Sequence, residues 1–125
     1  MMKPIHLLLV DDEERFLATT KIILDKRGMN TAIAKSGPDA LELLDRQPID
    51  VAVVDVKMPG MDGIELLRKI KQRWPRIEVI LLTGHASVES AVAGMKMGAG
   101  DYVMKPCDLK ELAAKVQAAF EKRKK

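Results

Sequence analysis

Four short apolar runs in this chain each lead directly into one or two polar side chains. The runs and the residues that follow them are 7–10 with Asp11 and Asp12, 51–54 with Asp55, 79–82 with Thr83, and 102–104 with Lys105. In an open α/β sheet, functional groups gather in the crevice beyond the carboxyl ends of the strands. The pattern therefore predicts one crevice that holds three carboxylates, one hydroxyl and one ammonium group.

Between these runs lie stretches whose apolar residues recur at helical spacing. Such an alternation is typical of successive βα units around a parallel sheet. The predicted strands cover about residues 5–10, 31–34, 51–54, 79–82 and 102–104. Central parallel strands are covered on both faces and read as continuous apolar runs, whereas 31–34 is shorter and more polar, as expected of an edge strand.

Five helices are predicted from their apolar faces and end signals. The apolar faces are Phe16, Leu17, Thr20, Ile23 and Leu24 in the first helix, and Val88, Ala91, Val92 and Met95 in the fourth. The start signals are Ser36, Gly37 and Pro38 for the second helix, the cap Ser87 for the fourth, and Asp108 with Glu111 for the fifth. Pro75 marks the end of the third helix. Right-handed crossovers leave few arrangements. The predicted fold class is α/β, a flavodoxin-like (βα)5 doubly wound sheet of five parallel strands, order 2-1-3-4-5, with helices on both faces.

Length and composition fit one globular domain. The 125 residues, 47% hydrophobic and 31% charged, bury a core without room for a second domain. The apolar runs fall far short of the ~20 residues that span a bilayer, and the N-terminus lacks a signal peptide's apolar stretch. One cysteine, Cys107, forms no internal disulfide, which fits a reducing compartment, so we expect a cytoplasmic protein without membrane contact.

Positive charge is concentrated at the C-terminal end. The net charge is +3, and residues 122–125 supply four positive charges, so the rest of the chain is close to neutral. Binding to nucleic acid needs a basic stripe on a folded face with polar or aromatic readers, and the sequence contains no such stripe. We interpret residues 121–125 as a solvated helix end favoured by the helix dipole, or as the start of a linker to an effector domain.

The polar residues at the strand ends match the motifs of a known family in order. The chain resembles the receiver domain of two-component response regulators, the CheY-like superfamily, in Asp11-Asp12, Asp55 with Met58-Pro59-Gly60-Met61-Asp62-Gly63, Thr83-Gly84, and Asp101-Tyr102-Val103-Met104-Lys105-Pro106. The resemblance spans nearly the whole chain and predicts a single receiver domain over residues 1–125. It implies that Asp55 accepts a phosphoryl group from a histidine kinase. It also implies that Asp11 and Asp12 hold Mg²⁺ or Mn²⁺, while Thr83 and Lys105 contact the phosphoryl group.

The same resemblance implies further roles and partners. These roles are the backbone carbonyl of Lys57 as a metal ligand, Pro106 as a cis-proline, Tyr102 as a switch aromatic coupled to Thr83, and Lys57 and His85 as modulators of phosphoryl lifetime. The implied partners are a sensor histidine kinase or phosphotransfer protein, and an effector domain or output protein. The output surface would be the fourth helix, fifth strand and fifth helix of a monomer or a phosphorylation-dependent dimer.

Elementary chemistry accounts for these residue types. Clustered carboxylates repel one another, so they take up protons or recruit a cation. Oxygen ligands from one or two carboxylates, with waters and a phosphoryl oxygen, suit Mg²⁺. Phosphoryl transfer to a carboxylate needs in-line positioning and neutralised equatorial oxygens. Hydrolysis of the acyl phosphate is the same transfer to water, so we expect a phosphoacceptor that slowly dephosphorylates itself, and not a turnover enzyme.

Each residue alone also has a simpler interpretation. The acidic pair 11–12 is a common N-cap, Thr83 a helix-entry residue, Lys105 a surface charge, and Tyr102 a strand residue with its hydroxyl in water. Asp55 is less suited to be a mere turn former, because Pro59-Gly60 and Asp62-Gly63 already supply turn residues.

Other functions share parts of the pattern. A haloacid-dehalogenase-like phosphatase uses the same residue types, but in an Asp-x-Asp motif with a cap insertion, whereas Asp11 and Asp12 are adjacent. A flavodoxin-like cofactor binder is disfavoured because the acidic segment 11–14 would repel a phosphate. A pseudo-receiver lacks site residues, and here the set is complete. A phosphorelay intermediate without an output of its own remains an alternative.

Overall fold

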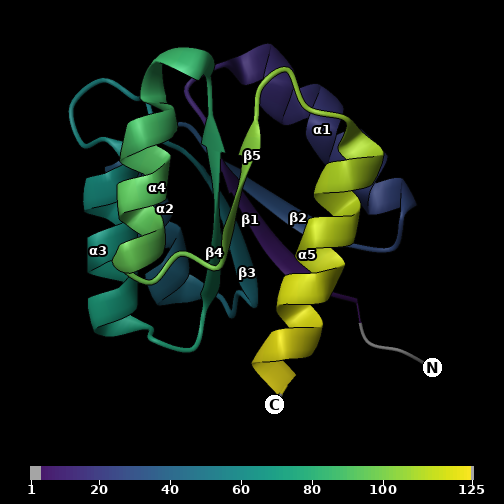
Figure 1. Ribbon diagram of the computed structural model, residues 1–125. Helices are drawn as coiled ribbons and strands as arrows, with labels where there is room; N and C mark the ends of the chain where they lie inside the picture. Colours follow the sequence, from purple (N-terminus) through teal and green to yellow (C-terminus); the bar gives the residue numbers. More distant parts are fainter. Residues whose placement is uncertain (1–3, 125) are drawn as a thin grey trace.

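The computed structural model describes residues 4–124 as a parallel sheet between two layers of helices (Figure 1). The five strands have the order β2-β1-β3-β4-β5, which confirms the predicted fold class and strand order. The elements are β1 (His6–Val10), α1 (Glu14–Lys26), β2 (Asn30–Ala34), α2 (Gly37–Arg46), β3 (Val51–Asp55), α3 (Gly63–Arg73), β4 (Glu78–Thr83), the 3-10 helix η1 (His85–Ser87), α4 (Val88–Lys96), β5 (Asp101–Met104) and α5 (Leu109–Lys124).

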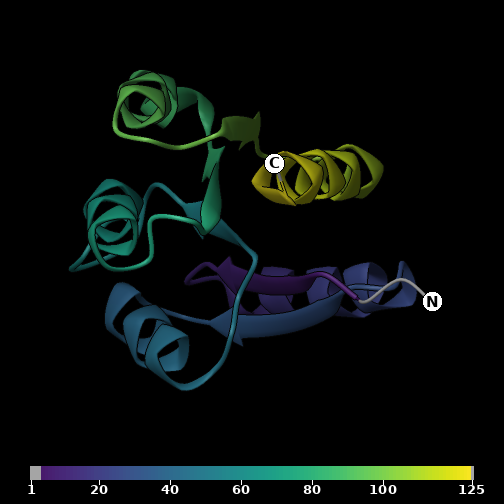
Figure 2. The ribbon, with the colours of Figure 1, turned by 90° about the horizontal axis from the view of Figure 1, so that it is seen from below.

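Two hydrophobic clusters lie on opposite faces of the sheet. One is covered by α2, α3 and α4, and the other by α1 and α5 (Figure 2). Successive residues of β1 alternate between them, with Leu8 and Val10 in the first cluster and Leu7 and Leu9 in the second. All residues of β3 are buried, because a central strand has no solvent face.

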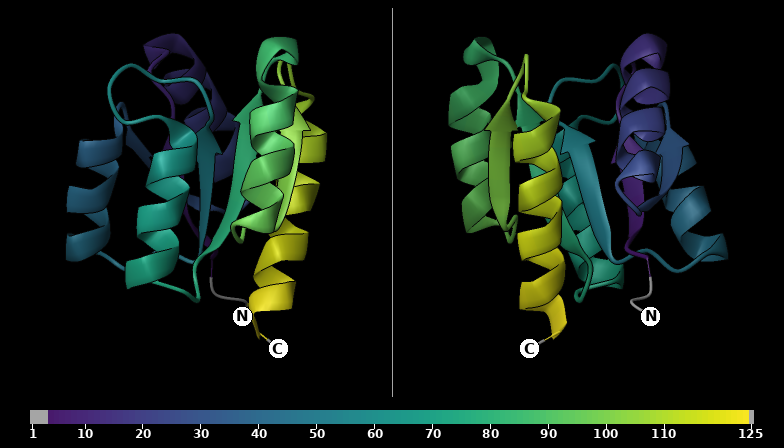
Figure 3. Two further views of the ribbon diagram at one scale, coloured as in Figure 1. Left: turned by 60° about the vertical axis from the view of Figure 1, so that its left-hand side comes forward. Right: turned by 90° about the vertical axis from the view of Figure 1, so that its right-hand side faces the viewer.

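The strands deliver their polar end residues to one edge of the sheet. Figure 3 shows the strand arrows pointing toward this common edge. The register pairs Val10 with Val54, Asp55 with Leu82, and Thr83 with Met104. The residues that end or directly follow β1, β3, β4 and β5 therefore lie at nearly the same level.

The edge strand β2 is not shorter than its neighbours, contrary to the prediction. It has five residues, as β1 and β3 do, whereas β5 has four. Side chains of α1 cover its outer edge: Lys21 donates to the Thr31 carbonyl at 2.7 Å, and Asp25 accepts the Thr31 N–H at 2.9 Å. An edge protected in this way does not need to be short to avoid pairing with another chain.

Helix α4 packs on the sheet through small residues. The prediction that Val92 and Met95 face the core is wrong, since they are 46% and 37% exposed, while Ala91 and Gly94 are buried. A Cβ at Gly94 would lie 2.5 Å from Cδ1 of Leu81, so a larger residue here would require the Leu81 side chain to shift. The larger apolar side chains consequently lie on the outer face.

The end of α5 is anchored, unlike the solvated end predicted for residues 121–125. The Arg123 guanidinium contacts the Asp50 carboxylate, and its Nε donates to the Arg76 carbonyl at 2.9 Å. Glu121 and Lys122 are exposed, and Lys125 lies outside the described residues. Among the helices of residues 4–124, none combines the length and hydropathy of a membrane span.

Candidate functional site

Three carboxylates meet where β1 and β3 end. Asp11 and Asp12 follow β1, Asp55 ends β3, and oxygen atoms from the three lie within 4.8 Å of one another. Asp11 is fully buried, Asp55 is 6% exposed, and Asp12 is exposed. Strands β1 and β3 are neighbours at the point where the strand order reverses. This is the position at which open α/β sheets bind ligands.

The loops around the carboxylates are fixed by backbone contacts. Asp11 accepts the Glu13 N–H at 2.9 Å, so it shapes the entry into α1, although it is not the N-cap residue of that helix. After β3, the chain turns back and Gly63 donates its N–H to the Val56 carbonyl at 2.9 Å. A Cβ at Gly63 would lie 2.2 Å from the Asp55 carbonyl oxygen, so this return requires glycine.

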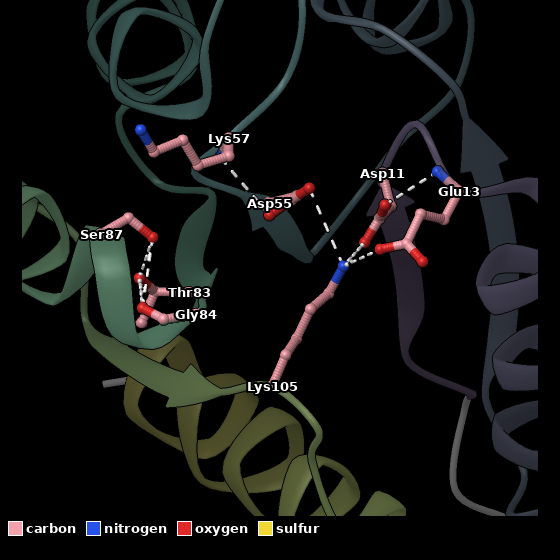
Figure 4. A network of polar contacts seen from close by, with 8 residues as sticks. All are labelled: Asp11, Glu13, Asp55, Lys57, Thr83, Gly84, Ser87 and Lys105. Atoms are coloured by element: carbon pink, nitrogen blue, oxygen red, sulfur yellow. Dashed lines mark hydrogen bonds and ion pairs between the residues drawn. The ribbon is translucent and has the colours of Figure 1, made fainter.

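Lys105 extends across the crevice from the end of β5 (Figure 4). Its Nζ contacts the Asp11 carboxylate and lies 3.0 Å from Glu13 Oε1 and 3.8 Å from Asp55 Oδ2. The ammonium also lies 4.6 Å from the centre of the Phe16 ring, a cation–π contact. The lysine therefore spans the gap between the strands, as the sequence predicts.

Two of these partners of Lys105 are not evident from the sequence. Glu13 looks like an ordinary first-turn acid, and Phe16 looks like one of several apolar residues of α1. The peptide bond between Lys105 and Pro106 is cis, in agreement with the family resemblance.

The electrostatics of the site are unbalanced. Burial, together with the negative charge of Asp11, raises the pKa of Asp55 to about 6, although Lys105 acts in the opposite direction. Burial lowers the pKa of Lys105, but its hydrogen bonds to Asp11 and Glu13 outweigh burial and the pKa is raised. One ammonium thus faces several carboxylates, and negative charge is in excess.

The donor set fits a hard divalent cation. The ligands at hand are carboxylate oxygens, which Mg²⁺ and Mn²⁺ prefer. A bound cation would also offset the repulsion between Asp11 and Asp55 that contributes to the raised pKa of Asp55.

The Thr83 hydroxyl lies in a separate group of contacts on the other side of the crevice (Figure 4). Thr83 is fully buried, and its Oγ1 lies 2.6 Å from Ser87 Oγ and 3.1 Å from the Gly84 carbonyl oxygen. Ser87 Oγ lies 3.3 Å from the same carbonyl. Ser87 occupies the N-cap position of α4, as predicted, but its hydroxyl makes no cap hydrogen bond and instead contacts Thr83.

The remaining predicted residues lie on several different elements. Tyr102 pairs in register with Leu81, and its ring is partly buried against the cluster that α3 and α4 cover. Lys57 is exposed directly after β3. The side chain of His85 lies outside the described part of the structure, so its role stays a prediction. Cys107 is partly buried, which raises the pKa of its thiol.

Comparison with known proteins identifies the class to which this fold and site belong. Residues 7–117 match the response regulator receiver domain, and the chain belongs to this family.

The chain resembles individual members over most of its length. It is 41% identical to the transcriptional regulatory protein ZraR of Escherichia coli K12 across 93% of this chain and 26% of that protein. It is 38% identical to the DNA-binding transcriptional regulator NtrC of Klebsiella pneumoniae across 90% of this chain and 24% of that protein. A receiver domain protein from Clostridium thermocellum has a solved structure with a TM-score of 0.92 and 34% identity, over 96% of this chain and 97% of that one. The chain thus spans about a quarter of the curated relatives, 26% and 24% of their lengths.

Proposed function

We propose that this receiver domain is a signalling switch in which Asp55 accepts a phosphoryl group from the phosphohistidine of a sensor histidine kinase or phosphotransfer protein. The observation that carries the proposal is the meeting of Asp55 with Asp11, Asp12 and the Lys105 ammonium at one edge of the sheet. A carboxylate with a pKa of about 6 is largely ionised at neutral pH and can act as a nucleophile.

The transfer forms a bond between an Asp55 oxygen and phosphorus while the bond from phosphorus to the histidine nitrogen breaks. Lys105 would neutralise charge on the phosphoryl oxygens, and Thr83 would donate its hydroxyl proton to one of them. Asp11, Asp12, Asp55 and the Lys57 carbonyl would hold Mg²⁺ or Mn²⁺. When bound, the cation supplies further neutralisation of negative charge.

In this proposal the domain is a phosphoacceptor, and its only hydrolytic activity is slow loss of its own phosphoryl group. Lys57 and His85 would modulate that rate. The proposed location is the cytoplasm, which suits both a histidine kinase partner and a single unpaired cysteine.

The signal would leave through the surface of α4, β5 and α5. On α4 and at its C-cap, the apolar side chains of Val92, Met95 and Met97 are 46%, 37% and 39% exposed, which suits contact with a partner. Tyr102 would couple this surface to Thr83 from the adjacent strand. Two relatives are named as transcriptional regulators and are about four times as long as the aligned region, so an effector domain is the proposed partner.

Within this proposal, residues 1–125 form one receiver domain, and any linker starts after Arg123, because that residue is bound to the body of the domain. A monomer, or a dimer formed on phosphorylation, fits the exposed apolar face of α4. A phosphorelay intermediate would use the same chemistry at Asp55 without a change at this face.

Phosphorylation tests the proposal directly. Incubation with acetyl phosphate and Mg²⁺ should add the mass of one phosphoryl group to the wild type and none to Asp55→Asn, because an amide does not form an acyl phosphate. Asp45→Asn, which changes an exposed carboxylate paired with Arg73, is the matched control and should be labelled like the wild type. Labelling of Asp55→Asn to the same extent as wild type would refute the assignment.

A further inference from the structure

We propose that Ser87 is a positioning residue that holds Thr83 in the unphosphorylated arrangement, so that the Thr83–Ser87 hydrogen bond opposes activation. The inference rests on the proposed function and adds a residue to it. Both side chains are buried, with exposures of 0% and 2%, and their hydroxyl oxygens lie 2.6 Å apart. In such a buried place, water does not replace a hydrogen bond that is broken.

A count of protons shows why this contact competes with a phosphoryl group. The two hydroxyls carry one proton each, and the Gly84 carbonyl only accepts. Either Thr83 donates to Gly84 and Ser87 donates to Thr83, or Ser87 donates to Gly84 and Thr83 donates to Ser87. In both cases neither proton is left over. A phosphoryl oxygen also only accepts, so it gains the Thr83 proton only when Thr83 stops donating that proton to Gly84 or Ser87.

The two partners are affected unequally when Thr83 moves. Ser87 keeps the Gly84 carbonyl as an acceptor at 3.3 Å, so its buried hydroxyl is satisfied before and after the change. In this proposal Thr83 moves away from Ser87 toward the phosphoryl group, so their contact belongs to the unphosphorylated arrangement. It is therefore a differential interaction, which is what biases an equilibrium between two states.

Ser87 is well placed to convey the release of Thr83 to α4. It is the last residue of η1 and directly precedes α4, so the bond ties the end of β4 to the start of that helix. The buried residues of α4 are Ala91 and Gly94, which offer one methyl group and no side chain to the contact with the sheet. Loss of the bond thus loosens the junction of α4 with the sheet.

Binding of beryllofluoride, a phosphoryl analogue, in the presence of Mg²⁺ tests the role of Ser87. Ser87→Ala should bind beryllofluoride about threefold to tenfold more tightly than wild type, the equivalent of one hydrogen bond. Ser87→Cys, which retains a side chain but only a weak donor, should shift affinity in the same direction. The exposed Ser90 on α4 provides the matched control, and Ser90→Ala should bind like wild type.

A double-mutant cycle separates positioning from general packing. In a Thr83→Val background, Ser87→Ala should leave the affinity for beryllofluoride unchanged, because the partner hydroxyl is already absent. NMR shifts of α4 in Ser87→Ala without beryllofluoride should move part of the way toward the bound spectrum. Equal or weaker binding by both Ser87 variants, or the same gain in the Thr83→Val background, would overturn the inference. A wild type that does not bind beryllofluoride would instead overturn the proposed function itself.

Discussion

The two ends of the sheet each hold an aspartate beside a cation, and the two pairs are built differently. At the amino end, Asp50 accepts the His6 N–H at 2.9 Å through one oxygen and contacts the Arg123 guanidinium through the other. Arg123 also donates to the Arg76 carbonyl. The negative charge of Asp50 is thus matched by the positive charge of Arg123. Helix α5, which carries Arg123, ends at the bottom of the molecule in this view (Figure 1).

At the carboxyl end, the contacts of Asp55 are looser and the charges are not matched. The Lys57 N–H lies 3.4 Å from Asp55 Oδ1, and Lys105 Nζ lies 3.8 Å from Oδ2, because Asp11 and Glu13 hold the ammonium more closely. Burial and a neighbouring carboxylate raise the pKa of Asp55. The comparison teaches that a matched pair stabilises the fold, whereas an unmatched cluster leaves carboxylate oxygens available to a ligand.

The largest expected effect is on stability at the amino end. Asp50→Ala removes the acceptor of the His6 N–H and leaves the partly buried Arg123 without its carboxylate, so we expect a loss of about 2 to 3 kcal/mol in the free energy of unfolding. Urea denaturation measures it. Asp45→Ala breaks an exposed pair with Arg73 and should cost less than about 1 kcal/mol. Equal losses in the two variants would remove the distinction between an anchoring pair and a surface pair.

A stabilising change is expected at the other end. The folded-state pKa of Asp55, about 6, lies above the ordinary value of 3.8, so the folded protein binds this proton more tightly than the unfolded chain does. Stability is therefore lost as the pH rises from about 4 to about 6, and the loss persists at higher pH. Asp55→Asn removes the ionised carboxylate and should raise the free energy of unfolding by about 2 kcal/mol at pH 7.5 in EDTA.

The pH dependence provides the control for this second prediction. Well below the ordinary value of 3.8 the wild-type carboxyl is protonated in both states, so the advantage of Asp55→Asn should shrink as the pH falls from about 6 and vanish there. Denaturation curves between pH 4 and 8 would show this convergence. A variant that is less stable than wild type at pH 7.5 would mean that Asp55, like Asp50, is a structural carboxylate.

The carboxyl end of the sheet is predictable from the sequence and the amino end is not. Each site residue directly follows an apolar run, so local pattern and the rule for strand ends suffice to bring Asp11, Asp55 and Lys105 together. Asp50 and Arg123 show no such pattern, because they belong to segments remote in sequence that meet only after the helix α5 has packed. Their pairing depends on the length and direction of that helix.

The differences from prediction at α4 and Ser87 have a common origin. Helical spacing shows which apolar residues share a face, but Gly94 decides how closely the helix approaches, and this turns Val92 outward. Ser87 does occupy the N-cap position of α4, yet its hydroxyl contacts Thr83 and makes no cap hydrogen bond. Tertiary contacts override local preference at both positions.

The smallest expected effect on the apo protein comes from Asp12. It is exposed, and its charge is a minor cause of the raised pKa of Asp55, so Asp12→Asn should change the free energy of unfolding in EDTA by no more than about 0.5 kcal/mol. Any change should be a gain, because one of three clustered negative charges is removed.

The same substitution should have a clear effect once Mg²⁺ is added. A cation that binds only the folded state stabilises it in proportion to the logarithm of its concentration over the dissociation constant. Wild type should therefore gain thermal stability with rising Mg²⁺ and Asp12→Asn should gain much less, while titration calorimetry reports the affinities. Asp39→Asn, which changes an exposed carboxylate in the first turn of α2, should respond like wild type. If Asp12→Asn binds Mg²⁺ as tightly as wild type, the acidic pair only shapes the entry into α1, and the excess negative charge at this end of the sheet serves some other purpose than holding a metal.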